Sequence, residues 1–321
     1  MTLYEEINKH AKEISQNIDI PDASHFDDFR ANIYNSSMDE RFRRMFIYGN
    51  GGELKCKATA TYSSSMLGYN FFHWINEETP LTLENITYTK VFFEVKLPTL
   101  KGTTAANIDI VLKGEDKHGN CVLLFIENKF TEYLSNSKST LTKMANSTYC
   151  TKSDKYYIGE DNARKWMGII KYFSDQANAS TNNGYYDGIK QNICHLIALS
   201  NLKNSKDARL SYERKYASHT TPVEHPGING TEIFLFKNLV FKPRKDFGLQ
   251  DSFTAYNTLY NTLLKKVKEI CSLDFFSPNE SILSLGDVWP DIKASIKDTE
   301  LIYYLEKRYI SSEAFIDKQN Q

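Results

Sequence analysis

The segment CVLLFIENKF, residues 121–130, constrains the fold more than any other part of the chain. It is rich in residues that favour strands, and successive side chains of a strand point to opposite faces. Leu123 and Phe125 therefore share one face, while Val122 and Leu124 share the other. Strands that are apolar on both faces usually lie inside a sheet that is covered on both sides. The segment thus predicts a central strand of a layered fold.

Two charged residues, Glu127 and Lys129, end this strand on one face, with their α-carbons about 7 Å apart. Such charges are costly to bury unless they are paired or bound to a metal. The preceding strand candidate, NIDIVLK (107–113), carries Asp109 among apolar residues, and the polar loop GEDKHGN between the two predicts a hairpin. Pairing of the two strands would bring Asp109 and Glu127 together near the open end of the sheet.

Two carboxylates and a lysine at one point indicate a hard-oxygen metal site, suited to Mg²⁺ or Mn²⁺. A metal there would polarise a phosphoryl oxygen and lower the pKa of a bound water. Lys129 would orient that water or stabilise charge on the phosphate. The alternative is a cross-strand salt bridge, which contributes little. Of the other ExK triplets, only Glu94–Lys96 lies in a convincing strand, and no strand-borne Asp precedes it closely.

The run NIDIVLKGEDKHGNCVLLFIENKF resembles the core of the PD-(D/E)XK nuclease superfamily, which has the restriction-endonuclease-like fold. In that family an Asp on one strand and a (D/E)xK on the next bind a divalent metal and arrange phosphodiester hydrolysis. The resemblance implies that Asp109 and Glu127 are metal ligands and that Lys129 is the family's lysine. FFEVKLP looks like the first core strand, which makes Glu94 a candidate additional acid. Members often carry a Gln on a later helix, which points to Gln191.

The match has departures and open points. Ile108 stands where many members have a proline before the Asp. His195, one turn after Gln191, is expected to be a buried residue with satisfied hydrogen bonds. The Arg41, Arg43 and Arg44 group could contact phosphates but fits a charged helix face better. The segment YCTKSDKYYIG (149–159) suits either base stacking or packing over the sheet.

Composition limits the partners and the compartment. The 321 residues carry a net charge of −1, which argues against a protein that coats nucleic acid non-specifically. Five cysteines without a CxxC pair support neither a disulfide framework nor a zinc ribbon. No apolar run approaches the roughly 20 residues that span a bilayer, and the start of the chain does not resemble a signal peptide. We expect a soluble, cytoplasmic protein with no membrane partner.

Periodicity outlines the remaining elements. Residues 131–160 read as loop with short helical pieces, and no internal repeat is found. Further strands are expected at 90–97 and 231–241, and helices at 3–18, 26–48, 63–75, 185–201, 254–271 and 299–310.

The sequence therefore predicts an α/β fold with a restriction-endonuclease-like mixed central sheet flanked by helices, and helical N- and C-terminal extensions. The expected divisions are a helical region at 1–85, a nuclease core at 86–245 and a helical region at 246–321, unless all three form one domain. The expected function is a Mg²⁺- or Mn²⁺-dependent nuclease of restriction type acting on nucleic acid, with duplex DNA as the expected substrate, as a homodimer. The alternatives are an inactive DNA-binding module of the same fold and a non-enzymatic α/β interaction protein.

Overall fold

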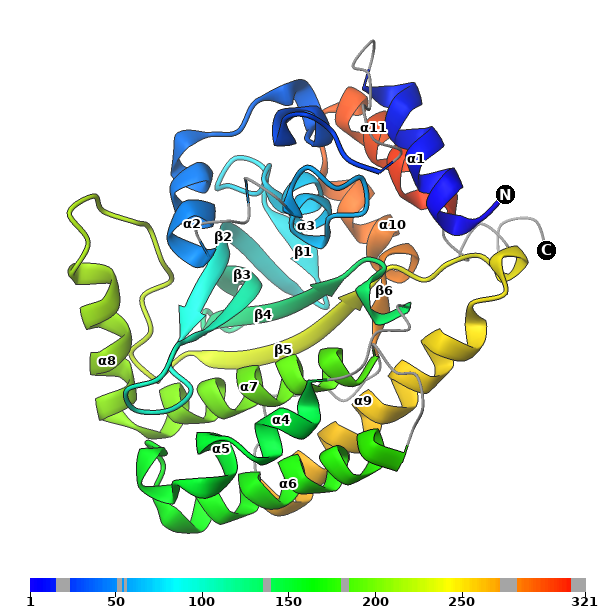
Figure 1. The fold of residues 1–321 in the computed structure, drawn as a ribbon. Helices are drawn as coiled ribbons and strands as arrows, with labels where there is room; N and C mark the ends of the chain where they lie inside the picture. Colours follow the sequence, from blue (N-terminus) through cyan, green and yellow to red (C-terminus); the bar gives the residue numbers. More distant parts are fainter. Residues whose placement is uncertain are drawn as a thin grey trace.

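A mixed six-stranded sheet runs through the centre of the computed structural model, with helices on both of its faces (Figure 1). The structure describes residues 1–15, 24–50, 54, 57–134, 140–179, 185–271 and 282–312. The strands lie side by side in chain order: β1 Leu81–Leu83, β2 Ile86–Leu97, β3 Ala106–Glu115, β4 Cys121–Lys129, β5 Ile233–Val240 and β6 Leu283–Ser284.

The direction of the strands changes in the middle of the sheet. The first four strands pair antiparallel, whereas β5 runs parallel to β4 and β6 runs parallel to β5. Parallel neighbours need a long crossover connection, and the chain between β4 and β5 supplies it through several helices. The α/β class and the mixed sheet expected from the sequence are confirmed.

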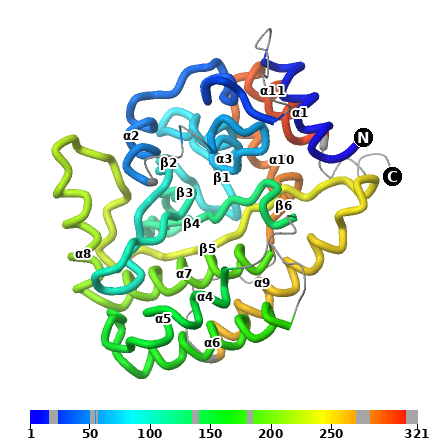
Figure 2. Tube along the Cα trace, viewed as in Figure 1, coloured from blue at the N-terminus to red at the C-terminus, as the bar shows by residue number. Residues whose placement is uncertain are grey.

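The α-helices described by the structure are α1 Leu3–Ile14, α2 Glu40–Asn50, α3 Ser64–Phe72, α4 Leu141–Ala145, α5 Thr148–Thr151, α6 Glu160–Ala179, α7 Tyr185–Asn204, α8 Lys206–Ala217, α9 Gln250–Cys271, α10 Leu285–Ser295 and α11 Thr299–Arg308. Helix α7 lies along one face of the sheet with α6 and α9 beyond it, and α2 and α3 lie on the other side (Figures 1 and 2). None of the described helices is long and apolar enough to cross a membrane.

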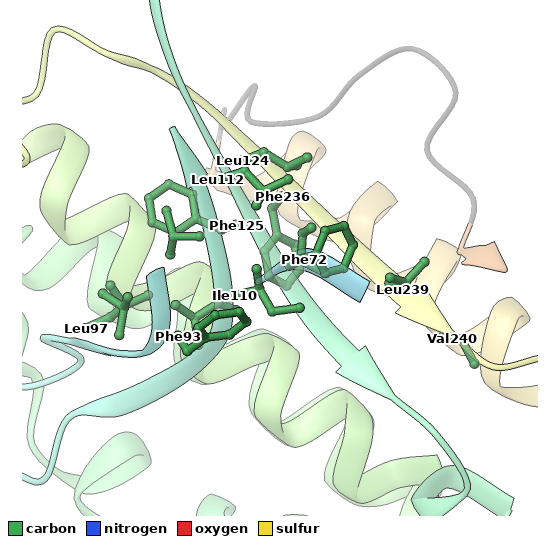
Figure 3. Packing of buried hydrophobic residues seen from close by; sticks show 14 of the residues in the cluster. Phe72, Phe93, Leu97, Ile110, Leu112, Leu124, Phe125, Phe236, Leu239 and Val240 are labelled. Carbon is green, nitrogen blue, oxygen red and sulfur yellow. The ribbon is translucent and has the colours of Figure 1, made fainter. Parts of the chain in front are cut away.

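The core fills both spaces between the sheet and its helices. Phe125 faces the α7 side and Phe236 lies beside it on β5, whereas Phe93 and Ile110 pack with the helices on the opposite side (Figure 3). A single cluster of buried apolar residues extends from Leu3 in α1 to the end of α11. The proposed boundaries near 85 and 245 therefore cut across continuous packing, although their value as domain boundaries stays a prediction.

The hairpin that joins β3 to β4 is stabilised within its own turn. Asp116 accepts backbone hydrogen bonds from His118 and Asn120 at 2.8 and 2.9 Å. Gly119 has a φ of +78°, a conformation that costs glycine little. The turn therefore fits GEDKHGN, as expected from the sequence.

The expected helix at 26–48 is wrong in its first half. Only Glu40–Asn50 forms an α-helix, and the chain before it holds two short 3₁₀ turns. Asn35 and Ser36 have φ values of +57° and +51°, which a right-handed helix cannot contain. The other expected helices and strands form close to their predicted bounds, and residues 16–18 of the expected helix at 3–18 lie outside the described residues. Helices α6, α8 and α10 and the short strands β1 and β6 were not predicted.

Candidate active site

The hairpin places Asp109 opposite Glu127. The last register pair between β3 and β4 joins Ile110 to Ile126, so the next pair along the strands is Asp109 with Glu127. Residues opposite each other in an antiparallel pair have side chains on the same face, with Cβ atoms about 5 Å apart. Asp109 Oδ2 also accepts a hydrogen bond of 2.7 Å from the backbone N–H of Asn128. The acid of one strand is thereby fixed against the end of the next.

Lys129 closes the group from the end of β4. Its Nζ lies 2.5 Å from Glu127 Oε1 and donates a hydrogen bond of 2.7 Å to Gln191 Oε1 on α7. Lys129 is 5 % exposed, whereas Gln191 is an exposed residue of the helix. The structure therefore brings Asp109, Glu127, Lys129 and Gln191 together.

His195 is a member of this group that sequence reasoning undervalued. Its Nδ1 lies 3.2 Å from Glu127 Oε2, and its Nε2 lies 2.9 Å from the backbone oxygen of Asn107. A carbonyl oxygen can only accept, so Nε2 carries the hydrogen of the neutral ring and Nδ1 faces Glu127 with a lone pair. The spacing of one helical turn from Gln191 was the available signal, since both side chains then point toward the same strand ends.

Burial and mutual repulsion set the protonation of the two acids. Burial, reinforced by the charge of Glu127, raises the pKa of Asp109 to about 8. Burial also raises the pKa of Glu127, and the neighbouring ammonium of Lys129 only partly offsets this effect. Two carboxyls in one buried place cannot both ionise cheaply, so the pair favours a nearby cation.

The pKa of Lys129 is raised in the site, whereas the pKa of His195 is lowered. Burial alone would lower the pKa of Lys129, but the carboxylates of Glu127, Asp109 and Glu132 outweigh it and raise that pKa. Burial lowers the pKa of His195 to about 4, so its imidazole is neutral at physiological pH. Lys129 is therefore the lasting positive charge of the group, and His195 is a neutral contact.

A ring of hydrogen bonds supports the site from below. Asn238 is the β5 residue paired with Glu127, and its Nδ2 donates to Asn192 Oδ1 at 2.7 Å. The Tyr256 hydroxyl on α9 donates to Asn238 Oδ1 at 2.9 Å and accepts from Asn192 Nδ2 at 3.1 Å. All three residues are completely buried, so the loss of any one hydrogen-bonding group would leave its partners unpaired and destabilise the fold. Helix α9 thereby links the C-terminal part of the chain to the site.

Glu94 lies next to this group on β2 but in an unusual backbone conformation. The register places it level with Asp109, and its φ is +51°, which is uncommon for a residue with a side chain. Its Oε2 accepts a hydrogen bond of 3.3 Å from Asn107 Nδ2. A Cβ added to Gly49 at the end of α2 would lie 2.5 Å from the Glu94 Cβ, so the glycine makes room for this side chain. Glu94 thus reaches the edge of the site through Asn107.

The residues present fit a hard divalent cation such as Mg²⁺ with an incomplete protein shell. Within the described residues, no group of three His, Cys, Asp or Glu side chains surrounds one metal position. Asp109 and Glu127 offer two carboxylates, and Mg²⁺ commonly binds through one or two carboxylates together with waters and substrate phosphates. Neither buried oxygen of Glu127 has a well-aligned hydrogen bond in the described structure, although nitrogens lie close to both. These oxygens retain ligand capacity for a cation.

Access to the group is one-sided. Glu127 is 0 % exposed, while Asp109 keeps part of its surface and Gln191 is exposed. A substrate would therefore approach past Asp109 and Gln191, where β3 begins and α7 passes over the sheet.

The remaining sequence candidates lie elsewhere. Arg43 and Arg44 form ion pairs with Glu40 in their own helix, and Arg41 lies 3.5 Å from Glu224, as expected for a charged helix face. In the 149–159 segment, Tyr156 is buried and donates a hydrogen bond of 2.7 Å to the Tyr149 backbone oxygen. This part of the segment packs over the α7 side.

Comparison with known proteins gives no relative for this chain: no family model, curated protein or solved structure matches it. The geometry of the site is therefore the basis for a functional conclusion.

Proposed function

We propose that this protein is a divalent-metal-dependent nuclease with a restriction-endonuclease-like core. The proposal rests chiefly on one observation: Asp109 and Glu127 occupy opposing positions on paired strands, and the buried Lys129 ammonium contacts Glu127. The antiparallel hairpin followed by a parallel strand supports it, because it presents an acid, a second acid and a lysine at one end of the sheet.

Asp109 and Glu127 are the residues that would hold Mg²⁺ or Mn²⁺. A bound metal supplies Lewis-acid polarisation of a phosphoryl oxygen and a water of lowered pKa. Binding requires both carboxyls to lose their protons, and the raised pKa of Asp109 makes this step sensitive to pH near neutrality. In the reaction, a water oxygen adds to phosphorus, one P–O bond breaks, and the leaving oxygen takes a proton.

Lys129 acts as a hydrogen-bond donor in this proposal. Its raised pKa keeps it an ammonium with three N–H groups, so it cannot serve as a general base near neutral pH. Among the described residues it contacts Glu127 and Gln191, which leaves one N–H for a water or a phosphate oxygen. A positive charge at that point stabilises the charge that develops on the phosphate.

Gln191, His195 and Glu94 have supporting roles. Gln191 fixes the direction of the Lys129 ammonium through its side-chain oxygen. His195 lies against Glu127 and is anchored at its other nitrogen by the Asn107 carbonyl. Glu94 reaches the site through the Asn107 side chain and is the more remote acid.

The substrate class is a phosphodiester, and duplex DNA is the expected form. Cutting both strands of a duplex requires two such sites, so a homodimer is expected, and sedimentation with and without DNA would measure it. The net charge of −1 means that any grip on nucleic acid must come from a local surface.

The competing proposal is a structural role, and the closeness of Lys129 to Glu127 favours it. The two groups already form an ion pair without a metal, and both are nearly inaccessible. Buried ion pairs, however, contribute little to stability compared with apolar side chains of similar size. A fold that needed only packing here would not require Asp109 and His195 on the same group.

A metal titration combined with plasmid cleavage tests the proposal. Purified protein is incubated with supercoiled plasmid and with single-stranded DNA and RNA over a series of Mg²⁺ and Mn²⁺ concentrations. Asp109→Asn and Lys129→Met keep the size of the side chains and remove the functional group. Arg164→Ala, an exposed change on α6, is the matched control.

We expect cleavage by the protein and the control, and a loss of at least about a thousandfold in Asp109→Asn and Lys129→Met. Calorimetry should detect Mg²⁺ binding that is lost in Asp109→Asn and kept in Lys129→Met. Binding of DNA without cleavage would favour the inactive module. A wild-type protein that neither binds metal nor cuts any substrate would remove the nuclease proposal.

A further inference from the structure

A basic concavity of about 580 Å³ lies beside the sheet, between α8 and the loop after β2. Its lining includes Lys101, Arg214 and Lys215 together with Tyr157, Ser211 and Asp207. Lys101 and Arg214 are exposed, and Lys215 is half-buried. Three cations and one acid line it, in a protein whose net charge is −1. We refer to it as the α8 concavity.

Specific contacts hold the walls of the α8 concavity together. The Tyr157 hydroxyl lies 3.1 Å from Ser211 Oγ, which joins the 149–159 segment to α8. The backbone N–H of Lys101 donates to the Lys155 backbone oxygen at 2.8 Å. The cations are therefore carried by backbone that is fixed from two sides.

The charges of the α8 concavity are mainly positive, and its cations are not paired with acids within the described part of the chain. Among the described residues, no ion pair joins Lys101, Arg214 or Lys215 to a carboxylate, and Asp207 makes none with them. Lys96, at the end of β2, lies over the ring of Tyr48 at 4.3 Å. Burial lowers the pKa of Lys215, and the charge of Lys96 lowers it further. Three cations beside a single acid leave an excess of positive charge, which favours binding of an anion.

Contacts of β2 link α8 to the strands that carry the candidate active site. The backbone N–H of Lys96 donates to the Tyr216 hydroxyl of α8 at 3.0 Å, next to Lys215. Lys96 is paired in the sheet with Asn107, which lies two residues before Asp109. Two residues along a strand span about 7 Å, so the end of β2 that contacts α8 lies near Asp109 in the sheet.

We propose that the α8 concavity binds the phosphate backbone of the nucleic-acid strand on one side of the cleavage position. This inference rests on the proposed nuclease function and adds to it where the substrate lies. Lys101, Arg214 and Lys215 contact successive phosphates, and the scissile phosphate lies at Asp109. Lys96 contributes charge to the same path.

The chemistry favours a polynucleotide over a small anion. The surface is open and its cations are spread over a loop and a helix, which suits a charge repeated along a chain. The Lys101 Nζ lies 5.8 Å from the centre of the Tyr157 ring, so a cation and an aromatic face lie side by side. Such pairs hold a backbone and stack a base.

A charge-matched pair of variants tests the surface. Lys101→Ala/Arg214→Ala removes two exposed cations from the α8 concavity. Lys165→Ala/Lys265→Ala removes two exposed cations from α6 and α9, so both variants have the same net charge. Affinity for a fluorescent duplex and for a single strand is measured by anisotropy without divalent metal, which keeps the strands intact, over a series of salt concentrations. Cleavage is then measured with Mg²⁺.

We expect the α8 variant to bind at least about tenfold more weakly at about 50 mM salt. The slope of its log affinity against log salt concentration should decrease by an amount that corresponds to about two phosphate contacts. The control should match the wild type. An α8 variant with the affinity and salt slope of the control overturns this inference while cleavage by the wild type keeps the nuclease proposal. If the α8 variant binds more weakly than a wild type that itself never cuts, the binding surface is supported and the nuclease proposal is removed. A wild type that binds no nucleic acid overturns both.

Discussion

The ammonium of Lys129, almost fully buried at the end of β4, donates a 2.7 Å hydrogen bond to the side-chain oxygen of the exposed Gln191 on α7. The contact joins the buried part of the candidate active site to its exposed side. An amide oxygen accepts without adding charge, so it directs the ammonium while leaving the charge of the site unchanged. A carboxylate in that position would add a third acid to Asp109 and Glu127.

Gln191→Ala should slow cleavage about 10- to 100-fold, because a hydrogen bond to a charged group contributes about 1.5–3 kcal/mol. Single-turnover cleavage with saturating Mg²⁺ measures the effect. Metal affinity should change little, since Gln191 is not a proposed ligand. Lys190→Ala, the neighbouring residue, which contacts Thr140 instead, is the control. Equal rates for the two variants would show that Gln191 does not direct Lys129.

Gly188→Ala should destabilise the fold by about 1–3 kcal/mol through overpacking. A Cβ at Gly188 in α7 would lie 2.7 Å from Tyr256 Cε2 and 2.9 Å from its hydroxyl oxygen. Gly168→Ala in α6 is the matched control, because no atom lies within 4 Å of its added Cβ. It should stabilise the helix by up to about 1 kcal/mol. Urea unfolding measures both, and a neutral Gly188→Ala would mean that Tyr256 can move aside.

Tyr256→Phe removes the hydroxyl shared by Asn192 and Asn238. The two amides lose a partner while they stay buried, so the free energy of unfolding should fall by about 1–3 kcal/mol. Tyr186→Phe is the control, because the Tyr186 hydroxyl makes no hydrogen bond to the described residues. We also expect slower cleavage in Tyr256→Phe, because Asn238 lies beside Glu127. A loss of stability with unchanged cleavage would limit the ring to a structural role.

The metal-free protein should lose stability as the pH rises toward 8. The pKa of Asp109 is raised to about 8 in the fold, whereas it is about 4 in an unfolded chain. Between these values the folded protein binds more protons than the unfolded chain, so its free energy of unfolding falls with rising pH. The slope of one such group is at most about 1.4 kcal/mol per pH unit.

Urea unfolding in EDTA from about pH 5 to about pH 8 measures this slope. Asp109→Asn should make it shallower, because the amide does not titrate. Asp246→Asn, in the exposed 3₁₀ turn before α9, should keep it, since the Arg244 guanidinium lowers the pKa of that carboxyl and keeps it ionised over this range. An identical slope in wild type and Asp109→Asn would place the titration elsewhere.

The sheet centre was accessible from sequence because its signals are local. Strands β3 and β4 are adjacent in the chain, have dense β-branched and aromatic residues, and are joined by a polar turn. Their alternation fixed the shared face of Glu127 and Lys129, and the hairpin supplied Asp109.

The rest of the site depends on distant packing. Gln191 and His195 lie one turn apart on the same side of α7, and the crossover between β4 and β5 decides that this side meets the strand ends. The contribution of Tyr256 comes from a helix more than a hundred residues after Lys129 in the chain. Helix α6 was not predicted, although its buried apolar residues have helical spacing: Ala163, Trp166, Ile169, Ile170 and Phe173. Helix α8 has little apolar periodicity, so the sequence gives only a weak signal for it.

The turn at Asp116, far from the proposed chemistry, sets the register of the two strands that carry the site. Side chains alternate along β3, so a slip of one residue between β3 and β4 would turn Asp109 away from Glu127 and into the apolar layer of α3. The hydrogen bonds from His118 and Asn120 to Asp116 fix the length of the turn and therefore the register. Adding or deleting one residue in this exposed turn should inactivate the protein as thoroughly as removing one of its acids.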